Sequence, residues 1–123
     1  MKTLIKNGKV VTSTGSCDAD VLIDGEKIVQ IGKNLSAGDA EEVDASGKYV
    51  LPGTIDPHTH ISMPFMGTNA VDDYKTGTEA AACGGVTTLV DFAIQAKGET
   101  LQETIERKKS WASGKAAVDF SNH

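Results

Sequence analysis

Aromatic residues are scarce in this sequence, at 5% of 123 residues, and only three prolines occur, whereas glycine is abundant at 13 residues. Few aromatic side chains and many glycines predict short strands joined by tight turns. Apolar residues make up 39% and charged residues 24%, which excludes an intrinsically disordered chain. At this length the chain can hold one ordinary domain, or a small domain and part of a larger one.

Excess positive charge is also missing, because the formal net charge is −5. This argues against nucleic acid or an anionic membrane surface as a partner. The two cysteines, Cys17 and Cys83, lie far apart without a CxxC spacing, which argues against a disulfide framework. No apolar run is long enough for a signal-peptide core or a membrane span. We therefore expect a soluble, cytoplasmic protein.

The first fifty residues predict a small antiparallel β unit. They contain three pairs of short apolar segments around turn-forming residues: 4–5 and 10–11 around Asn7-Gly8, 21–23 and 28–31 around Asp24-Gly25, and 42–43 and 49–50 around residues 44–47. Asn-Gly and Asp-Gly favour the positive φ angles of two-residue hairpin turns. We therefore expect three hairpins in this segment.

From residue 51 onward, strands and helices alternate. The expected elements are a strand at 54–61 interrupted by Pro57, a helix at 76–83, a buried strand at 86–94, a helix from Thr100 and a strand at 116–120. Capping boxes are expected for both helices, Thr76 with Glu79 and Thr100 with Glu103. Leu101, Ile105, the stem of Lys108, Trp111 and Ala112 are expected on the inner stripe of the second helix. This β-α-β-α-β order predicts a parallel sheet.

The number of elements indicates an unfinished domain. Three strands and two helices are less than half of a (β/α)₈ barrel, which needs roughly 250 residues. The sequence ends at His123, at the end of a strand with no covering helix. We therefore expect a truncated barrel, in which inward-facing side chains such as Val90, Phe92 and Val118 lack an opposing layer.

The sharpest motif is Asp56-Pro57-His58-Thr59-His60. Side chains at i and i+2 of a strand lie on the same face, so His58 and His60 project together. Two imidazoles at the carboxyl end of an inner barrel strand supply part of a divalent-metal site. A bare HxH pair also occurs by chance, but its position after an apolar strand, at the start of a β-α-β pattern, favours metal binding. His123 lacks such a spacing and is expected to be a buried or terminal structural histidine.

Further motifs support a specific resemblance. They are Gly53-Thr54-Ile55-Asp56-Pro57-His58-Thr59-His60, Met63-Pro64-Phe65, Gly77-Thr78, Ala80-Ala81-Ala82, Gly84-Gly85-Val86-Thr87-Thr88 and Asp91-Phe92, with residues 4–8 and 44–53. Together they cover essentially the whole chain and resemble the N-terminal third of the hydantoinases and dihydropyrimidinases, which are cyclic amidohydrolases. Asn122 departs from the aromatic-rich pattern of that family. By this resemblance residues 1–50 are a partial β-sandwich-like domain and residues 51–123 the first part of the amidohydrolase barrel.

The resemblance implies a complete active site with two zinc ions bridged by a carboxylated lysine and a hydroxide. His58 and His60 match the pair on the first barrel strand. The hydroxide attacks the carbonyl of a cyclic amide, a hydantoin or a dihydropyrimidine, and opens the ring C–N bond. The bridging lysine, two more histidines and a proton-shuttling aspartate are expected downstream, since neither Lys97 nor Lys115 fits the pattern. No catalytic residue is therefore assigned in this chain, and the isolated chain is expected to be inactive.

The same resemblance assigns Met63 and Phe65, in the loop after the first strand, to the substrate pocket. The alternative is that this loop only packs the barrel mouth. Asp91 is expected to be a hydrogen-bonded structural carboxylate and not a catalyst. The complete protein is expected to be a homo-oligomer, a tetramer.

Other functions remain open on the sequence alone. Within the enzymes, the alternative is a dihydroorotase or an allantoinase. Outside them, it is a non-catalytic dihydropyrimidinase-like assembly protein that has lost the metal, although a scaffold has no need for both His58 and His60. A natural interaction module is a third alternative, against which the unfinished sheet edge argues.

Overall fold

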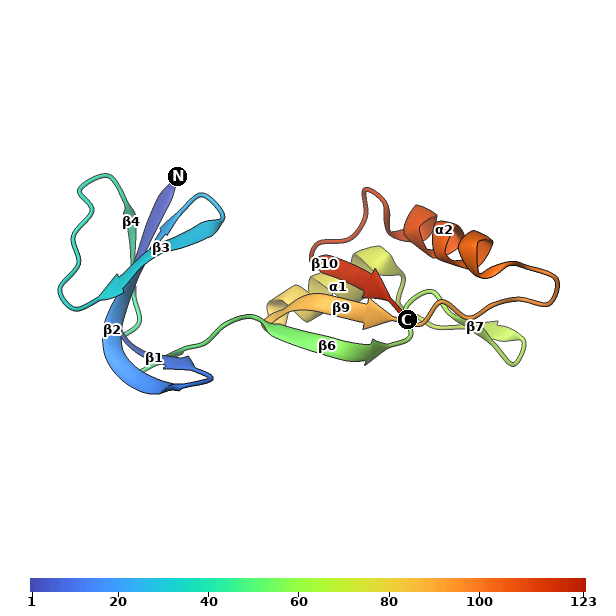
Figure 1. Cartoon of the computed structure of the whole chain (residues 1–123), viewed down its shortest axis with the longest axis horizontal. Helices are drawn as coiled ribbons and strands as arrows, with labels where there is room; N and C mark the ends of the chain where they lie inside the picture. The colour runs from blue at the N-terminus through green and yellow to red at the C-terminus, as the bar shows by residue number, and fades with distance from the viewer. The chain divides into compact units, whose positions relative to one another are not determined.

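The computed structural model describes all 123 residues, and the chain divides into two compact units, Met1–Pro52 and Gly53–His123 (Figure 1). No helix in either unit has the length and apolar character needed to cross a membrane. Each unit is described by itself below.

The first unit is a sheet of five strands. They are β1 (Lys2–Thr12), β2 (Gly15–Asp24), β3 (Lys27–Gly32), β4 (Glu41–Asp44) and β5 (Tyr49–Val50). The first three pair antiparallel in the order β3-β2-β1, and β4 and β5 both pair with β1 in parallel. Its small core contains Val10, Ala19 and Val21. The unit is therefore antiparallel only in its first three strands.

Two of the three expected hairpins in this unit are wrong. Asn7 has the expected positive φ of 62°, but it lies in a β-bulge inside the continuous strand β1, where its backbone N–H donates to Asp20 Oδ1 at 2.8 Å. The segments at 42–43 and 49–50 do not pair with each other, because both lie along β1. The hairpin between β2 and β3 is confirmed, but its turn lies one residue later than expected, at Gly25-Glu26, because Asp24 pairs with Lys27; Gly25 has a φ of 61°.

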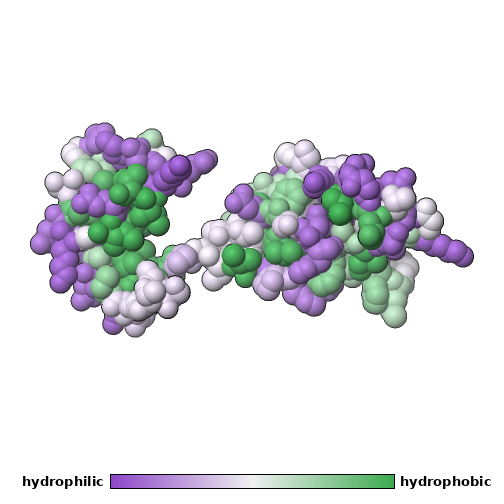
Figure 2. Space-filling model, viewed as in Figure 1, coloured by the Kyte–Doolittle hydropathy of each residue, from purple (hydrophilic) through white to green (hydrophobic).

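Hydrophobic side chains remain exposed on the first unit. Figure 2 shows hydrophobic residues gathered on the face of this unit that is turned to the viewer. Ile28, Val29 and Ile31 of β3 are 63%, 55% and 49% exposed. A five-stranded sheet without a covering layer leaves such side chains in contact with water.

The second unit combines a parallel sheet with two helices. Its elements are β6 (Thr54–Thr59), β7 (Pro64–Phe65), β8 (Thr68–Asn69), α1 (Tyr74–Cys83), β9 (Val86–Asp91), α2 (Leu101–Ala112) and β10 (Asp119–Asn122). The strand order is β10-β9-β6, with every pair parallel, as the alternation predicts. Strands β7 and β8 form a separate antiparallel hairpin.

Both helices cover the same face of this sheet. Tyr74 of α1 and Ala112 of α2 pack with Leu89 of β9 in one buried cluster, against which Val118 and Phe120 also pack. The expectation that Val118 faces away from the helices is therefore wrong. The opposite face, which carries Val90, has no covering layer within this unit (Figure 1).

The helix boundaries follow their caps. Helix α1 begins two residues earlier than expected, because the Asp73 carboxylate accepts hydrogen bonds from the N–H groups of Lys75 and Thr76 at 2.8 and 2.9 Å. Helix α2 begins as expected, with Thr100 and Glu103 forming a capping box. The expected inner stripe of α2 is only partly right: Leu101 is 67% exposed, whereas Thr104, Lys108 and Ala112 are buried. The last strand starts three residues later than expected.

Candidate metal site at the carboxyl end of the parallel strands

Two irregularities in the pairing of β6 with β9 shape the strand that carries the histidines. Thr54 pairs with Val86 and the next residue with Thr88, so Thr87 is an extra residue on β9. Its side chain lies over Gly53, where a Cβ atom would come within 2.1 Å of Thr87 Cγ2. Only a residue without a side chain fits this close approach.

The second irregularity lies at Pro57. Asp56 pairs with Leu89 and Thr59 with Asp91, so β6 carries one extra residue in this segment. Proline has no N–H to donate, and a bulge is one of the few places in a sheet that tolerates it. The sequence-based expectation that Pro57 interrupts the ladder is confirmed.

The rings of His58 and His60 lie close together at this end of the sheet. Their centroids are 5.1 Å apart, and the rings meet edge to face. Both residues are exposed. The ring of Phe92, which follows β9, lies 4.8 Å from His58 and 5.1 Å from His60. The i, i+2 spacing and the neighbouring strand thus bring three rings to one place.

Asp56 and His123 have backbone partners at this end of the sheet. Asp56 Oδ1 accepts a hydrogen bond from the backbone N–H of His58 at 3.1 Å. Nε2 of His123 lies 2.8 Å from the carbonyl oxygen of Pro57, and its ring lies 4.9 Å from Phe92. The contact agrees with a structural role for His123, although the residue is exposed. Sequence reasoning missed this position of His123, because it depends on the register of β10 against β9, which no short motif records.

The separation of the His58 and His60 rings suits one shared metal ion. Zinc binds imidazole nitrogen at about 2.0–2.1 Å, so two rings on one tetrahedral ion have centroids about 5 Å apart. The observed 5.1 Å matches that separation. No cluster of three or more His, Cys, Asp or Glu side chains in the chain has an arrangement that could hold a metal ion. The pair alone is therefore a partial ligand set.

A buried polar network lies beside the pair, on the helix-covered side of the sheet. Asp91 is fully buried, and its carboxylate accepts hydrogen bonds from Lys108 Nζ at 2.6 Å and from the Tyr74 hydroxyl at 2.9 Å. The expectation that Asp91 is a hydrogen-bonded carboxylate is confirmed, and its structural, non-catalytic role stays a prediction. Burial, reinforced by the hydrogen bond to Asp91, raises the pKa of Tyr74. Sequence reasoning missed the burial of the Lys108 ammonium, because it assigned only the stem to the core.

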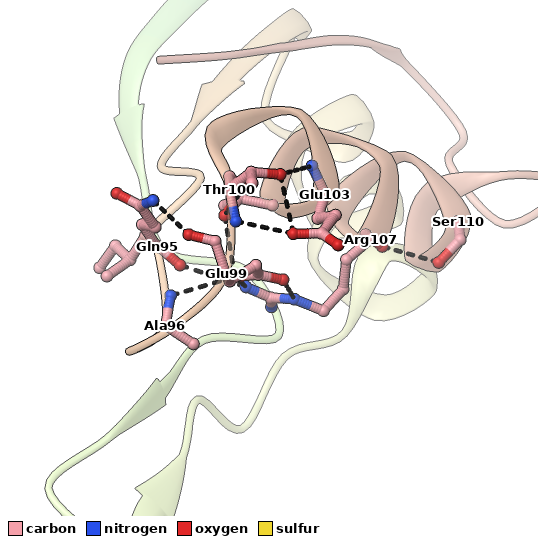
Figure 3. A network of polar contacts seen from close by, with 9 residues as sticks. Gln95, Ala96, Glu99, Thr100, Glu103, Arg107 and Ser110 are labelled. Carbon is pink, nitrogen blue, oxygen red and sulfur yellow. Dashed lines mark hydrogen bonds and ion pairs between the residues drawn. The ribbon is translucent and has the colours of Figure 1, made fainter.

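A second network holds the loop between β9 and α2 (Figure 3). The Arg107 guanidinium donates to both carboxylate oxygens of Glu99, at 2.7 and 2.8 Å. The Glu99 carboxylate also accepts from the backbone N–H of Ala96 at 3.0 Å and from the Thr104 hydroxyl at 2.8 Å. These hydrogen bonds, that from Arg107 first, lower the pKa of Glu99 to about 2. The loop that follows Phe92 is therefore tied to α2.

The two residues assigned to the substrate pocket lie in different surroundings. Met63 is half-buried and lines a hollow that it shares with Phe92 and Trp111. Phe65 is 56% exposed and lies on the hairpin β7–β8. The turn of this hairpin has two residues with positive φ, at 48° and 82°, as a type I′ turn requires.

Comparison with known proteins identifies the relatives of the chain. Residues 49–115 match the sequence model of the Amidohydrolase family. The D-hydantoinase of Geobacillus stearothermophilus is 52% identical over 123 residues, which are 100% of this chain and 26% of that protein. The dihydropyrimidinase of Rattus norvegicus is 44% identical over 127 residues, covering 99% of this chain and 24% of that protein.

Solved structures give the same result. The crystal structure of dihydropyrimidinase from Brevibacillus agri superposes with a TM-score of 0.96 at 54% identity, and the match covers 100% of this chain and 27% of that one. The chain thus spans about a quarter of the length of the relatives that it matches.

Proposed function

Because this chain belongs to the Amidohydrolase family, we propose that it supplies part of a metal-dependent hydrolase that opens the ring C–N bond of cyclic amides. The observation that carries this proposal is the 52% identity to a D-hydantoinase along the entire chain. The resemblance to hydantoinases and dihydropyrimidinases that the motifs indicate is confirmed. It favours this function over a dihydroorotase or an allantoinase.

The proposed domains follow from the two units. The parallel strands β6, β9 and β10, with helices on one face only, are the first part of a (β/α)₈ barrel in this proposal. The opposite face of the sheet then corresponds to the barrel interior, where the layers of inward side chains lie. The first unit is part of a β-sandwich-like domain. Support comes from the TM-score of 0.96 to a dihydropyrimidinase chain nearly four times as long.

The proposed cofactor is a divalent metal, with two zinc ions in the complete site. When bound, such a metal lowers the pKa of water and polarises the carbonyl oxygen of the substrate. His58 and His60 hold one ion through neutral ring nitrogens. Phe92 packs against both rings and restricts their rotation, and Asp56 holds the backbone of His58 at the bulge. These contacts orient the two ligands before the ion binds.

The proposed substrate is a hydantoin or a dihydropyrimidine, with Met63 and Phe65 beside its exocyclic substituent.

The complete protein is proposed to be a homo-oligomer, a tetramer. A non-catalytic assembly protein is the other candidate, but the exposed pair of His58 and His60 gives no advantage to a scaffold.

The test uses a chimera in which residues 1–123 replace the matching 26% of the Geobacillus stearothermophilus D-hydantoinase. His58→Ala and His60→Ala should each lower the zinc content, measured by elemental analysis, together with hydantoin hydrolysis, by about 100-fold or more in rate. His123→Ala is the matched control, because this exposed histidine lies in the same cluster, and it should keep its zinc. Equal zinc stoichiometry in the chimera and its His58→Ala variant would falsify the proposal.

A further inference from the structure

Ile61, the residue directly after His60, has both of its backbone polar groups held by buried side chains. Its N–H donates to Asp91 Oδ1 at 3.2 Å, and its carbonyl oxygen accepts from Lys108 Nζ at 2.8 Å. Asp91 ends β9 and Lys108 lies on α2, so two separate elements hold the two peptide groups on either side of the Ile61 Cα. These two hydrogen bonds fix the backbone conformation directly after His60.

The same carboxylate oxygen also holds the backbone of the aromatic residue that follows β9. Asp91 Oδ1 accepts a second hydrogen bond from the backbone N–H of Phe92 at 2.9 Å. Phe92 is the residue whose ring packs against both His58 and His60. One buried oxygen therefore sets the position of the peptide that follows His60 and of the ring that lies against the pair.

Burial of the Lys108 ammonium is weak evidence for a role in stability alone. Its residue is 2% exposed, and besides Asp91 and the Ile61 carbonyl it faces the rings of Tyr74 and Trp111, at 5.6 and 5.4 Å from their centroids. Removing two charges from water costs about as much as their attraction returns, so apolar residues of similar size often give equal or higher stability. A buried pair that bonds the peptide beside a site is better explained by the geometry that it imposes.

We propose that Asp91 and Lys108 are a positioning pair for the metal site of His58 and His60, a role that rests on the proposed function. The pair touches neither imidazole. It acts through the backbone of Ile61 and of Phe92. By fixing these two backbone segments, it limits the orientations that the rings of His58 and His60 can adopt before they bind one ion. Groups that orient metal ligands from outside the ligand set change metal affinity by about 10–100-fold when they are removed.

The experiment measures the zinc affinity of the D-hydantoinase chimera described above by competition with a chelator, together with its thermal midpoint of unfolding. Lys108→Met removes the ammonium and leaves Asp91 unpaired, so it should weaken zinc binding about 10-fold or more and also destabilise the fold. The double variant Asp91→Asn, Lys108→Met removes both charges and the Lys108 hydrogen bond to the Ile61 carbonyl, while the Asn amide oxygen can still accept from the N–H groups of Ile61 and Phe92. It should return the midpoint close to that of the wild type and still bind zinc about 10-fold more weakly.

A matched control lies one residue away on the same helix. Arg107→Met breaks the ion pair with Glu99, which touches neither Ile61 nor Phe92, and zinc affinity should stay unchanged. Amide hydrogen exchange gives a readout without metal: the Ile61 peptide should exchange faster in Lys108→Met than in Arg107→Met.

The outcomes separate this inference from the proposed function. Wild-type zinc affinity in the double variant would overturn the positioning role alone, since His58→Ala would still empty the site. A loss of zinc affinity in Arg107→Met as large as that in Lys108→Met would also overturn it. Any loosening of α2 would then be enough to weaken zinc binding. Absence of zinc from the chimera without any substitution would overturn both proposals together.

Discussion

Replacing Gly53 by alanine should push β6 away from β9 and weaken the site that β6 carries. A Cβ atom at this position would lie 2.1 Å from Thr87 Cγ2, 2.2 Å from Oγ1 and 2.7 Å from Cβ. Rotation of the Thr87 side chain can move the first two atoms but not its Cβ. Ordinary contact begins at 3.4 Å, so the two backbones must separate.

The expected cost of this separation is about 1–3 kcal/mol, the range for overpacking that forces backbone shifts. Denaturant unfolding of the D-hydantoinase chimera measures this loss of stability. Gly38→Ala is the control, because its Cβ would meet nothing within 4 Å and its φ is not positive. Because β6 also carries His58, zinc affinity should fall in Gly53→Ala and stay unchanged in Gly38→Ala.

A second substitution tests the cause. Thr87→Gly removes all three clashing atoms, so Gly53→Ala, Thr87→Gly should recover most of the loss due to Gly53→Ala. Thr87→Gly alone should cost about 1 kcal/mol, because glycine is a poor strand residue. If the two substitutions destabilise additively, or if Gly53→Ala costs no more than Gly38→Ala, the close approach is not the reason for this glycine.

Two further predictions concern the loop network and the isolated chain. The Arg107 guanidinium and its neighbours lower the pKa of Glu99 from 4.5 to about 2, so its stabilising contribution is present above about pH 4.5 and is lost as the pH falls through 2. Glu99→Gln should therefore lower the thermal midpoint at pH 6, and the difference from wild type should shrink toward pH 2; a difference that stays constant over that interval would contradict the ion pair. The isolated 123-residue chain should bind zinc weakly by calorimetry and hydrolyse no hydantoin, because His58 and His60 leave the ion short of the usual three protein ligands and water. Metal-dependent turnover by the purified chain would refute this.

The sequence by itself determined the features that depend on local chemistry. The segment around Gly25 forms a hairpin because Gly25, the first residue of the turn, adopts the positive φ that the turn needs. Thr100 with Glu103 caps α2 because the three-residue spacing brings each side chain to the other's backbone. The i, i+2 spacing of His58 and His60, at the end of β6 and directly after it, brings their rings together. Each of these involves residues within a few positions of one another.

The tertiary structure alone decided the features that depend on distant partners. Asn7-Gly8 has the residues of a turn, but pairing of β1 with β2 and with β5 makes it a bulge in a continuous strand. Lys108 has the sequence character of a surface residue, and only the position of Asp91 on β9 accounts for its buried ammonium.

The same holds for the site. His123 reaches Phe92 and the Pro57 carbonyl because β10 pairs with β9 in one particular register. Thr87 lies over Gly53 because the register shifts at that point. Register and burial result from the packing of whole elements, whose free energy is shared among many contacts that no short motif records.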